Sequence, residues 1–386
     1  MKADVSVKNY YSLLQRKFKN QKSIHDLSLP QLGDKLYHTL RSSDATPATF
    51  YGLPKIHKPD VPLRPITSSI NCPTYQVSRY LASILSPLQN NKYTVKNSSD
   101  FVEKLSANTI DPQEIMVSFD VVSLLTSIPT TLALQVTKNR LECDLTISER
   151  TNLFVDNIMK LLEMMLDNNY FVFNGAFYKK IFGCPMGSPV SAILANLVME
   201  HVEERALDTT PHTPKWWYRY VDDNHVCLSR DHLTEFHNHL NSINPHIKFT
   251  VEEEKDGSIA FLDTRTTRNP DGTIKTSVYR KATHTDKYLH FNSHHPSQHK
   301  RLVARTLLDR ARKIPSTEDD KLSEVQHVVD ALTINGYTDS FIRSCQNTTT
   351  PTPEVQPQSQ TRKGFVALPY IKGISEKLKE LRIVST

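Results

Sequence analysis

The alternation of apolar and polar residues divides the chain into strands and helices. Short segments rich in aromatic and β-branched residues predict strands, and apolar residues at spacings of three and four predict helices. A buried strand is expected to end at Asp120 and to lead into a turn and a helix. Other strands are predicted at 51–70 (two, around a Lys58-Pro59-Asp60 turn), 170–180 (a hairpin turning at Asn174-Gly175), 216–228 (a hairpin), 246–253, 258–266 and 273–280. Helices are predicted at 73–106, 151–168 and 190–207. Further helices are predicted in the basic region that begins at Arg280, as far as about residue 332.

This order of elements indicates an α+β fold. No Gly-rich phosphate loop follows the first strand, so a doubly wound nucleotide-binding fold is disfavoured. An antiparallel sheet backed by helices, with a helical domain after it, fits the pattern better.

Composition places the chain among ordinary globular proteins. Its 386 residues are 38% hydrophobic and 23% charged, enough for two or three packed units. No apolar run approaches the ~20 residues that span a bilayer, and the first residues lack the apolar core of a secretory signal. The five cysteines are widely spaced, which favours a reducing compartment.

Two adjacent aspartates interrupt a strand-like stretch, WWYRYVDDNHVCL (Trp216–Leu228). Consecutive strand residues point to opposite faces, so one of Asp222 and Asp223 should face inward, where an unpaired carboxylate is costly. A hairpin apex would hold both at the sheet edge, facing a cleft, and Asp120 could join them. Divalent ions would stabilise such a group and support phosphoryl transfer, whereas an isolated Asp-Asp pair is usually a solvated turn.

A glycine-flanked loop precedes a predicted helix in GCPMGSPVSAILANLVMEH (Gly183–His201). The chain has only 10 glycines, and two of them bracket this loop, where glycine permits close approach of a ligand. Ser188 is predicted to cap the helix and Pro189 to be its first residue. An ordinary capped helix would give the same pattern.

Lys55 and Arg64 lie on the two strands of the Pro-rich hairpin. A lysine point charge and an arginine fork together suit a triphosphate, although each alone would be read as an exposed charge.

Positive charge is concentrated in one block, although the net charge is only +6. Residues 280–313 carry nine Lys/Arg and five His against two aspartates, which suits a polyanionic partner or a solvated helix face. Within Lys300–Ile314, one helical face carries Arg301, Arg305 and Arg312, as in a helix laid on a nucleic-acid backbone. The histidines do not favour zinc, because no cysteine or dense carboxylate cluster completes a tetrahedron nearby.

Five motifs in order resemble the reverse transcriptase of Penelope-like retroelements, relatives of telomerase reverse transcriptase. They are LPKIHK with LRPI, SFDVVSLLTSIP, FNGAFYKKIFGCPMGSPVSAILAN, RYVDD, and IKFTVEEE with IAFLDT. The resemblance covers roughly residues 49–345. The stretch VYRKATHTDKYLHFNSHHPSQHK and the helices after it resemble the family's helix-turn-helix thumb.

The resemblance implies roles for the matching residues. Catalysis and the binding of two Mg²⁺ ions are assigned to Asp120, Asp222 and Asp223, with Val121 beside the metals and with Tyr220 and Val221 completing the hairpin. The incoming nucleotide is assigned to Lys55, Arg64, Leu125, Gly187 and Ser188. Nucleic-acid contacts are expected at Leu262 and Asp263, near the primer end, and at Lys300, Arg301, Arg305 and Arg312 of the basic helix.

The resemblance also implies a right-hand fold of fingers, palm and thumb. The expected divisions are a helical extension (1–48), fingers (49–113), a palm (114–283) with a fingers insertion near 132–180, a helical thumb (284–345), a low-complexity linker (346–364) and the start of a connector (365–386). The family's C-terminal GIY-YIG nuclease is not found. The sequence departs from the family at Leu125, usually a Phe that rejects ribonucleotides, and at Lys180, Cys184 and Ala192.

The function expected from these residues is RNA-directed DNA polymerisation, with an RNA template, a DNA primer and dNTPs as partners. A nucleic-acid-binding remnant without activity and an RNA-directed RNA polymerase are the alternatives. Integration into chromosomes would require the nucleus, and no membrane association is expected.

Overall fold

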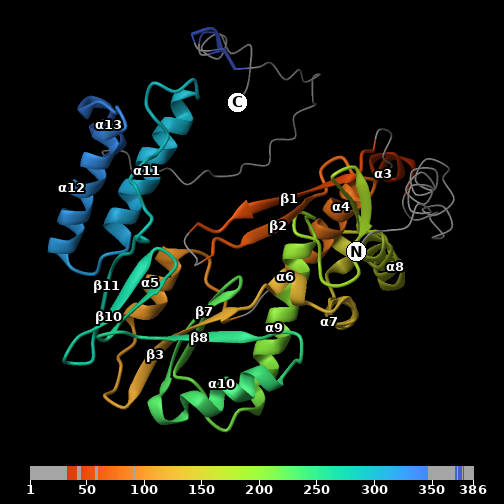
Figure 1. Ribbon diagram of the computed structural model, residues 1–386, viewed down its shortest axis with the longest axis horizontal. Coiled ribbons are helices and arrows are strands. Elements are labelled where there is room, and N and C mark those ends of the chain that lie inside the picture. Colours follow the sequence, from red (N-terminus) through yellow and green to blue (C-terminus); the bar gives the residue numbers. More distant parts are fainter. Residues whose placement is uncertain are drawn as a thin grey trace. The chain divides into compact units, whose positions relative to one another are not determined.

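Figure 1 shows a computed structural model, which describes residues 33–40, 45–56, 60–89, 92–346, 370–371, 373–375 and 377. Most of the predicted N-terminal extension, the linker and the connector lie outside these residues, as do Lys58 and Pro59 of the predicted turn. Within the described part, no helix has the length and apolar character needed to cross a membrane.

The described chain forms two compact units. The first contains residues up to Lys96 together with Asp111–Lys255, and the second contains Asn97–Ile110 together with the chain from Asp256 onward. The strands between 258 and 278, which the sequence assigned to the palm, fall in the second unit. The boundaries of fingers, palm and thumb therefore stay predictions.

The first unit is built on an antiparallel sheet in the order β6-β7-β3-β8. Its strands are β3 (Glu114–Val121), β6 (Trp216–Tyr220), β7 (Asp223–Ser229) and β8 (Phe249–Glu253). Alternate residues of these strands enter one large apolar core, to which the long helix α9 (Ser191–Thr209) contributes Leu194, Leu197 and Val198. The other helices of this unit are α3 (Gly33–Leu40), α4 (Tyr75–Leu85), η1 (Ser86–Leu88), α6 (Leu124–Ser127), α7 (Thr130–Glu142), η2 (Ile147–Glu149), α8 (Val155–Asp167), η3 (Arg230–His232) and α10 (Leu233–Ser242).

Two predicted hairpins form a second sheet in the same unit. Strands β1 (Ala48–Pro54) and β2 (Leu63–Ser68) pair, as do β4 (Tyr170–Phe173) and β5 (Ala176–Lys179), and a short parallel contact between β1 and β4 joins them. The turn between β4 and β5 has positive φ at both Asn174 and Gly175, the geometry that favours Asn-Gly in two-residue hairpins. Both hairpin predictions are confirmed.

The described part of the second unit combines a small sheet with four helices. Its strands are β9 (Ser258–Phe261), β10 (Thr264–Arg268) and β11 (Ile274–Val278), and its helices are α5 (Ser98–Ser106), α11 (Ser297–Lys313), α12 (Glu318–Ile334) and α13 (Asp339–Gln346). Helices α11 to α13 enclose a separate core that includes Leu307, Leu308 and Leu332.

Two element predictions need correction. The strand expected at 258–266 is a hairpin, because Leu262 adopts a φ of 55° and reverses the chain between β9 and β10. The helix expected over 73–106 ends at Leu85 and resumes at Ser98. Between them, Tyr93–Val95 runs along the edge strand β6, where the amide of Val95 donates to the carbonyl of Arg219 at 2.8 Å.

Helix α9 carries two carboxyl groups into the core of the first unit, since Glu200 and Glu203 are fully buried. Glu203 pairs closely with Arg219 of β6, with 2.7 Å between Oε1 and Nε. Glu200 has a weaker partner, Arg140, whose Nη2 lies 3.7 Å from Oε2. Burial raises the pKa of Glu200 to about 7, and attraction by Arg219 and Arg140 only partly opposes this shift.

We predict that Glu200 makes the free energy of unfolding depend on pH. The folded chain keeps this proton up to about pH 7, whereas an exposed glutamate loses it near 4.5. Folding therefore takes up a proton between these values, and stability falls as the pH rises from about 4.5 to about 7, by on the order of 3 kcal/mol. Urea unfolding at about pH 5 and about pH 8 should show this fall in the wild type and a smaller one in Glu200→Gln. The control is Glu204→Gln, an exposed neighbour; equal pH dependence in all three proteins would refute the prediction.

Candidate active site

Pairing of β3 with β7 places three carboxylates at one end of the central sheet. Asp120 lies directly opposite Asp223 in the register. Asp222 lies in the two-residue turn that joins β6 to β7. Directly opposed residues have Cβ atoms about 5 Å apart on one face of a sheet, so Asp120 and Asp223 are neighbours. Asp120 and Asp222 are exposed and Asp223 is half-buried, so the inward-facing aspartate of the pair is Asp223.

The environment of Asp223 favours its neutral form. Burial is the main cause that raises its pKa to about 6, and the charges of Asp120 and Asp222 raise it further. A hydrogen bond acts in the opposite direction, since Ser118 Oγ donates to Asp223 Oδ1 at 2.8 Å. Ser118 was missed by the sequence analysis, although it lies two residues before Asp120 and therefore on the same face of β3.

These donors fit a hard divalent cation. Carboxylate oxygens are the ligands that Mg²⁺ prefers, and a cation would relieve the repulsion among the three aspartates. Val121, expected beside the metals, ends β3 with its side chain buried. Its amide donates to the carbonyl of Asp222 at 3.1 Å, which ties the turn to the strand that bears Asp120.

Hydrogen bonds tie the loop Gly183–Ser188 to two other parts of the first unit. On one side, the amide of Cys184 donates to the carbonyl of Leu125 in α6 at 2.7 Å. On the other, the amide of Thr67 in β2 donates to the carbonyl of Met186 at 2.8 Å. The loop therefore connects the segment after Asp120 with the strand that carries Arg64.

The two glycines of this loop are required by close backbone packing. Gly187 has a φ of 115°, and a Cβ on it would lie 2.3 Å from the carbonyl oxygen of Thr67. Gly183 has a φ of 78°, and its Cβ would lie 2.6 Å from the carbonyl oxygen of Thr126. Both positions combine a left-handed conformation with a contact that leaves no space for a side chain.

Ser188 does not cap α9, contrary to the prediction. The helix begins at Ser191 with Val190 at the N-cap, so Pro189 is not its first residue. Ser188 is buried, and its Oγ lies 2.6 Å from Oγ of Ser78 in α4. The hydroxyl therefore holds the loop against α4, and any nucleotide contact here would come from the loop backbone.

The predicted triphosphate residues lie on the β1–β2 hairpin. Arg64 of β2 is opposite Leu53 and exposed, and Lys55 follows the end of β1. The amide of Lys55 donates to the carbonyl of Pro62 at 2.9 Å and closes this part of the hairpin. Their contact with a nucleotide stays a prediction.

The residues expected near the primer end lie in the second unit. Leu262 and Asp263 form the turn between β9 and β10. Asp263 forms an ion pair with Arg310 of α11, with 3.4 Å between Oδ1 and Nη2.

The cationic face of α11 is largely engaged within the unit. Lys300 is buried, and its ammonium group donates to the carbonyl of Ser293 at 2.8 Å, so we no longer expect it to contact nucleic acid. Arg301 lies over the ring of Phe341 in α13 and donates to Ser344 at 3.0 Å. Arg312 donates to the carbonyl of Gln346 at 3.3 Å, and Arg305 is half-buried. Periodicity placed these residues on one face but could not show that α13 packs there.

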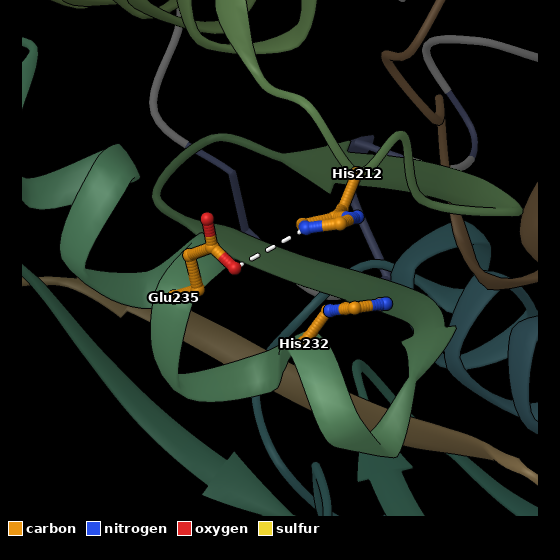
Figure 2. Close-up of side chains that lie close together, drawn as sticks. All are labelled: His212, His232 and Glu235. Atoms are coloured by element: carbon orange, nitrogen blue, oxygen red, sulfur yellow. Dashed lines mark ion pairs between the residues drawn. The ribbon is translucent and has the colours of Figure 1, made fainter.

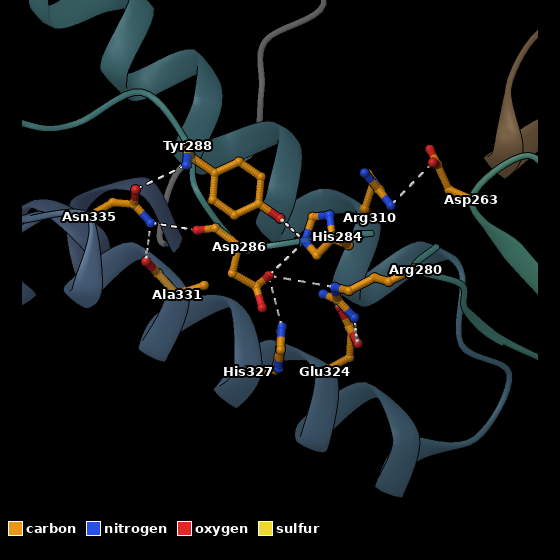
Figure 3. A network of polar contacts seen from close by, with 10 residues as sticks. All are labelled: Asp263, Arg280, His284, Asp286, Tyr288, Arg310, Glu324, His327, Ala331 and Asn335. Atoms are coloured by element: carbon orange, nitrogen blue, oxygen red, sulfur yellow. Dashed lines mark hydrogen bonds and ion pairs between the residues drawn. The ribbon is translucent and has the colours of Figure 1, made fainter. Parts of the chain in front are cut away.

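A polar network joins the segment 280–288, which precedes α11, to α12 (Figure 3). Asp286 contacts His284 at 2.8 Å and His327 at 3.2 Å. Arg280 forms two hydrogen bonds with the carboxylate of Glu324. Burial alone would raise the pKa of Asp286, but the histidine contacts outweigh it and the pKa is lowered. Arg280, His284 and Glu324 of this network also line a cleft of about 350 Å³.

Figure 2 shows three side chains of metal-binding types, His212, His232 and Glu235. Glu235 lies 3.2 Å from Nε2 of His212, and the two imidazole rings are stacked with centroids 3.5 Å apart and planes 7° from parallel. Imidazole lone pairs lie in the ring plane, so parallel stacked rings do not direct them at one ion. The cluster also lies at the end of the β6–β7 hairpin away from Asp222. We assign no metal to it.

Comparisons with known proteins concern the helical region and the fold. Residues 287–347 match the animal helix-turn-helix domain. No curated protein sequence matches the chain.

Solved structures with a similar fold include telomerases and a viral polymerase. Telomerase from Candida albicans, in complex with a TWJ fragment of telomeric RNA, has a TM-score of 0.54 at 13% identity, over 82% of this chain and 58% of the telomerase. The corresponding Candida tropicalis complex gives 0.49 at 14% identity, over 80% and 56%. The Sicinivirus 3Dpol RNA-dependent RNA polymerase gives 0.49 at 11% identity, over 79% and 67%.

The chain has the right-hand polymerase fold, which the C. albicans telomerase match and the antiparallel central sheet support. This confirms the predicted fold class. The chain spans less than two thirds of that telomerase, and at 13% identity the similarity concerns the fold.

We predict that Gly187→Ala destabilises the first unit more than Gly175→Ala. Both glycines have positive φ, so both changes carry a strain of about 1 kcal/mol. A Cβ on Gly175 meets nothing within 4 Å, whereas one on Gly187 collides with Thr67. The collision should add on the order of 1–3 kcal/mol, measurable by urea unfolding. Equal losses for the two variants would show that the loop is not held against β2 as described.

Proposed function

We propose that this chain is a nucleic-acid polymerase, and more specifically the RNA-directed DNA polymerase of a Penelope-like retroelement. The observation that carries the proposal is the register of β3 and β7, which sets Asp120 against Asp223 with Asp222 in the adjoining turn. Three carboxylates at the end of the central sheet of a right-hand fold suit metal-assisted phosphoryl transfer. The five motifs in order support the finer assignment, and the helix-turn-helix match agrees with the expected thumb.

In this proposal, the chain's own residues position the reactants. Lys55 and Arg64 would bind the triphosphate through a point charge and a planar fork. The backbone of the Gly183–Ser188 loop would approach the nucleotide at Gly187, which is exposed and has no side chain. A primer 3′-hydroxyl aligned with the α-phosphate then needs little further reorganisation.

Asp120, Asp222 and Asp223 would hold Mg²⁺, with Val121 contributing through its backbone. When bound there, two such ions would supply the positive charge that stabilises the attacking and leaving oxygens. Asp223 would have to be ionised for this role, which its hydrogen bond from Ser118 assists.

Nuclear localisation belongs to the retroelement proposal, because integration into chromosomes takes place in the nucleus.

Leu125 bears on the choice between deoxyribonucleotides and ribonucleotides. Its side chain is half-buried, and its backbone carbonyl is held by the Gly183–Ser188 loop. The family that the chain resembles usually has a phenylalanine here, which rejects ribonucleotides. Because leucine replaces it, extension should be measured with both dNTPs and NTPs.

We predict that the protein extends a DNA primer on an RNA template in the presence of Mg²⁺ and dNTPs, and that Asp222→Asn abolishes extension. The amide keeps the size of the side chain but removes the charge, so the rate should fall by about a thousandfold or more. Asp120→Asn should have the same effect. Asp231→Asn, at an exposed aspartate of η3, is the matched control and should retain activity.

The possible outcomes separate the alternatives. Extension with NTPs but not dNTPs would identify an RNA polymerase. Tight binding of primer–template by a wild-type protein that does not extend it would identify a remnant without catalysis. Full activity of Asp222→Asn would refute the proposed site.

A further inference from the structure

A fully buried arginine lies three residues before Asp222. Arg219 of β6 has 0% exposure, and its guanidinium reaches four partners, two on α9, one in the 93–95 segment and one in the β6–β7 turn. Nε lies 2.7 Å from Oε1 of Glu203. Nη1 donates to Asn196 at 2.5 Å and Nη2 donates to Thr94 at 3.1 Å.

The fourth contact of Arg219 is with the catalytic hairpin itself. Nη1 also donates to the backbone carbonyl of Val221, the first residue of the turn, at 3.2 Å. The core ion pair is therefore connected directly to the peptide group that leads into Asp222.

Val221 has an unfavourable backbone conformation. Its φ is 58°, in the left-handed region, and Val221 is both β-branched and exposed at this position. Glycine usually occupies such a place in a two-residue hairpin turn. A conformation of this kind persists only where its surroundings hold it, and such conformations gather at active sites.

The backbone around Asp222 is held from both sides. Arg219 binds the carbonyl that precedes Asp222, and the amide of Val121 binds the carbonyl of Asp222 itself at 3.1 Å. Val121, which donates the second of these hydrogen bonds, directly follows Asp120 in β3. With both peptide groups fixed, the Cα and Cβ atoms of Asp222 have a defined position relative to the end of β3.

We propose that Arg219 is a positioning residue that holds the Val221-Asp222 turn in its strained conformation and so presents Asp222 beside Asp120. This inference rests on the proposed polymerase function. Arginine suits the task because its planar fork makes several hydrogen bonds in fixed directions, which a lysine ammonium cannot reproduce. Glu203 compensates the charge of Arg219 through Nε and leaves Nη1 able to reach the carbonyl of Val221.

The first test measures the turn without any substrate. Amide hydrogen exchange of the segment 218–224 is compared in the wild type, Arg219→Lys and Arg140→Lys. Arg140 pairs with Glu200 and Glu204 on the same helix α9, and among the described residues it makes no contact with the hairpin, so it is the matched control. Arg219→Lys should raise exchange at Asp222 and Asp223 by about tenfold or more, while Arg140→Lys leaves it unchanged. Unchanged exchange in Arg219→Lys would overturn the proposal, whatever the enzymatic activity.

The second test uses Val221→Gly to remove the strain that Arg219 is proposed to hold. Arg219→Lys should lower kcat about 10- to 100-fold with little change in the KM for dNTP, because a misplacement near 1 Å is enough for such a loss. In the Val221→Gly background the same change should cost less than about threefold, since glycine adopts the left-handed conformation without help. Equal losses in the two backgrounds would mean that Arg219 acts only as a core ion pair.

Failure of the polymerase activity and failure of Arg219→Lys to fold can each be told apart from failure of the positioning role. If the wild type and Val221→Gly both fail to extend a primer, the proposed function fails, but hydrogen exchange still decides the role of Arg219. If Arg219→Lys does not fold, the pair Arg219→Gln with Glu203→Gln leaves no unpaired charge in the core and is measured in the same backgrounds.

Discussion

Two like charges face each other across β3 and β7, because the antiparallel register pairs Asp120 with Asp223. A sheet of ordinary composition would avoid this arrangement, since directly opposed carboxylates repel. Burial contributes most to the raised pKa of Asp223, and the charges of Asp120 and Asp222 add to it. The arrangement is retained because the apolar residues of the same strands are locked in the core, and a slip of one residue would turn every one of them outward.

The surrounding structure fixes this end of the sheet in several directions. Val121 and Arg219 hold the turn that carries Asp222, and the Gly183–Ser188 loop holds Leu125 after β3 and Thr67 on β2. Apart from the Arg219 guanidinium, both partners in each of these contacts are backbone groups, whose positions depend little on side-chain rotamers. The site is therefore built mainly from main-chain geometry, and the carboxylates are placed on a frame that packing has already defined.

The sequence was sufficient for the local parts of this arrangement. Strand periodicity and turn residues identified β3, the β6–β7 hairpin and the Asn174-Gly175 turn, and they brought Asp120 and Asp222 together by argument. What failed depended on distant partners. Ser188 was read as a helix cap because Ser-Pro suits one, but the packing of α4 gave its hydroxyl another partner. The contacts of Arg301 and Arg312 with α13 were not predicted, because nothing local indicates that this helix packs beside them, and their nucleic-acid contacts stay predictions. Arg219 was passed over because a polar residue in a strand gives no sign of whether an acidic helix lies beneath it.

The claim that most of this account depends on is that the three aspartates form one cation site. Binding of Mn²⁺ as a substitute for Mg²⁺, measured by electron paramagnetic resonance in the presence of an RNA template, a DNA primer and a non-hydrolysable dNTP, tests it directly. The account predicts that the wild-type protein binds the ion and that the Asp120→Asn/Asp222→Asn double variant loses this binding while it remains folded. Undiminished Mn²⁺ binding by the folded double variant would contradict it.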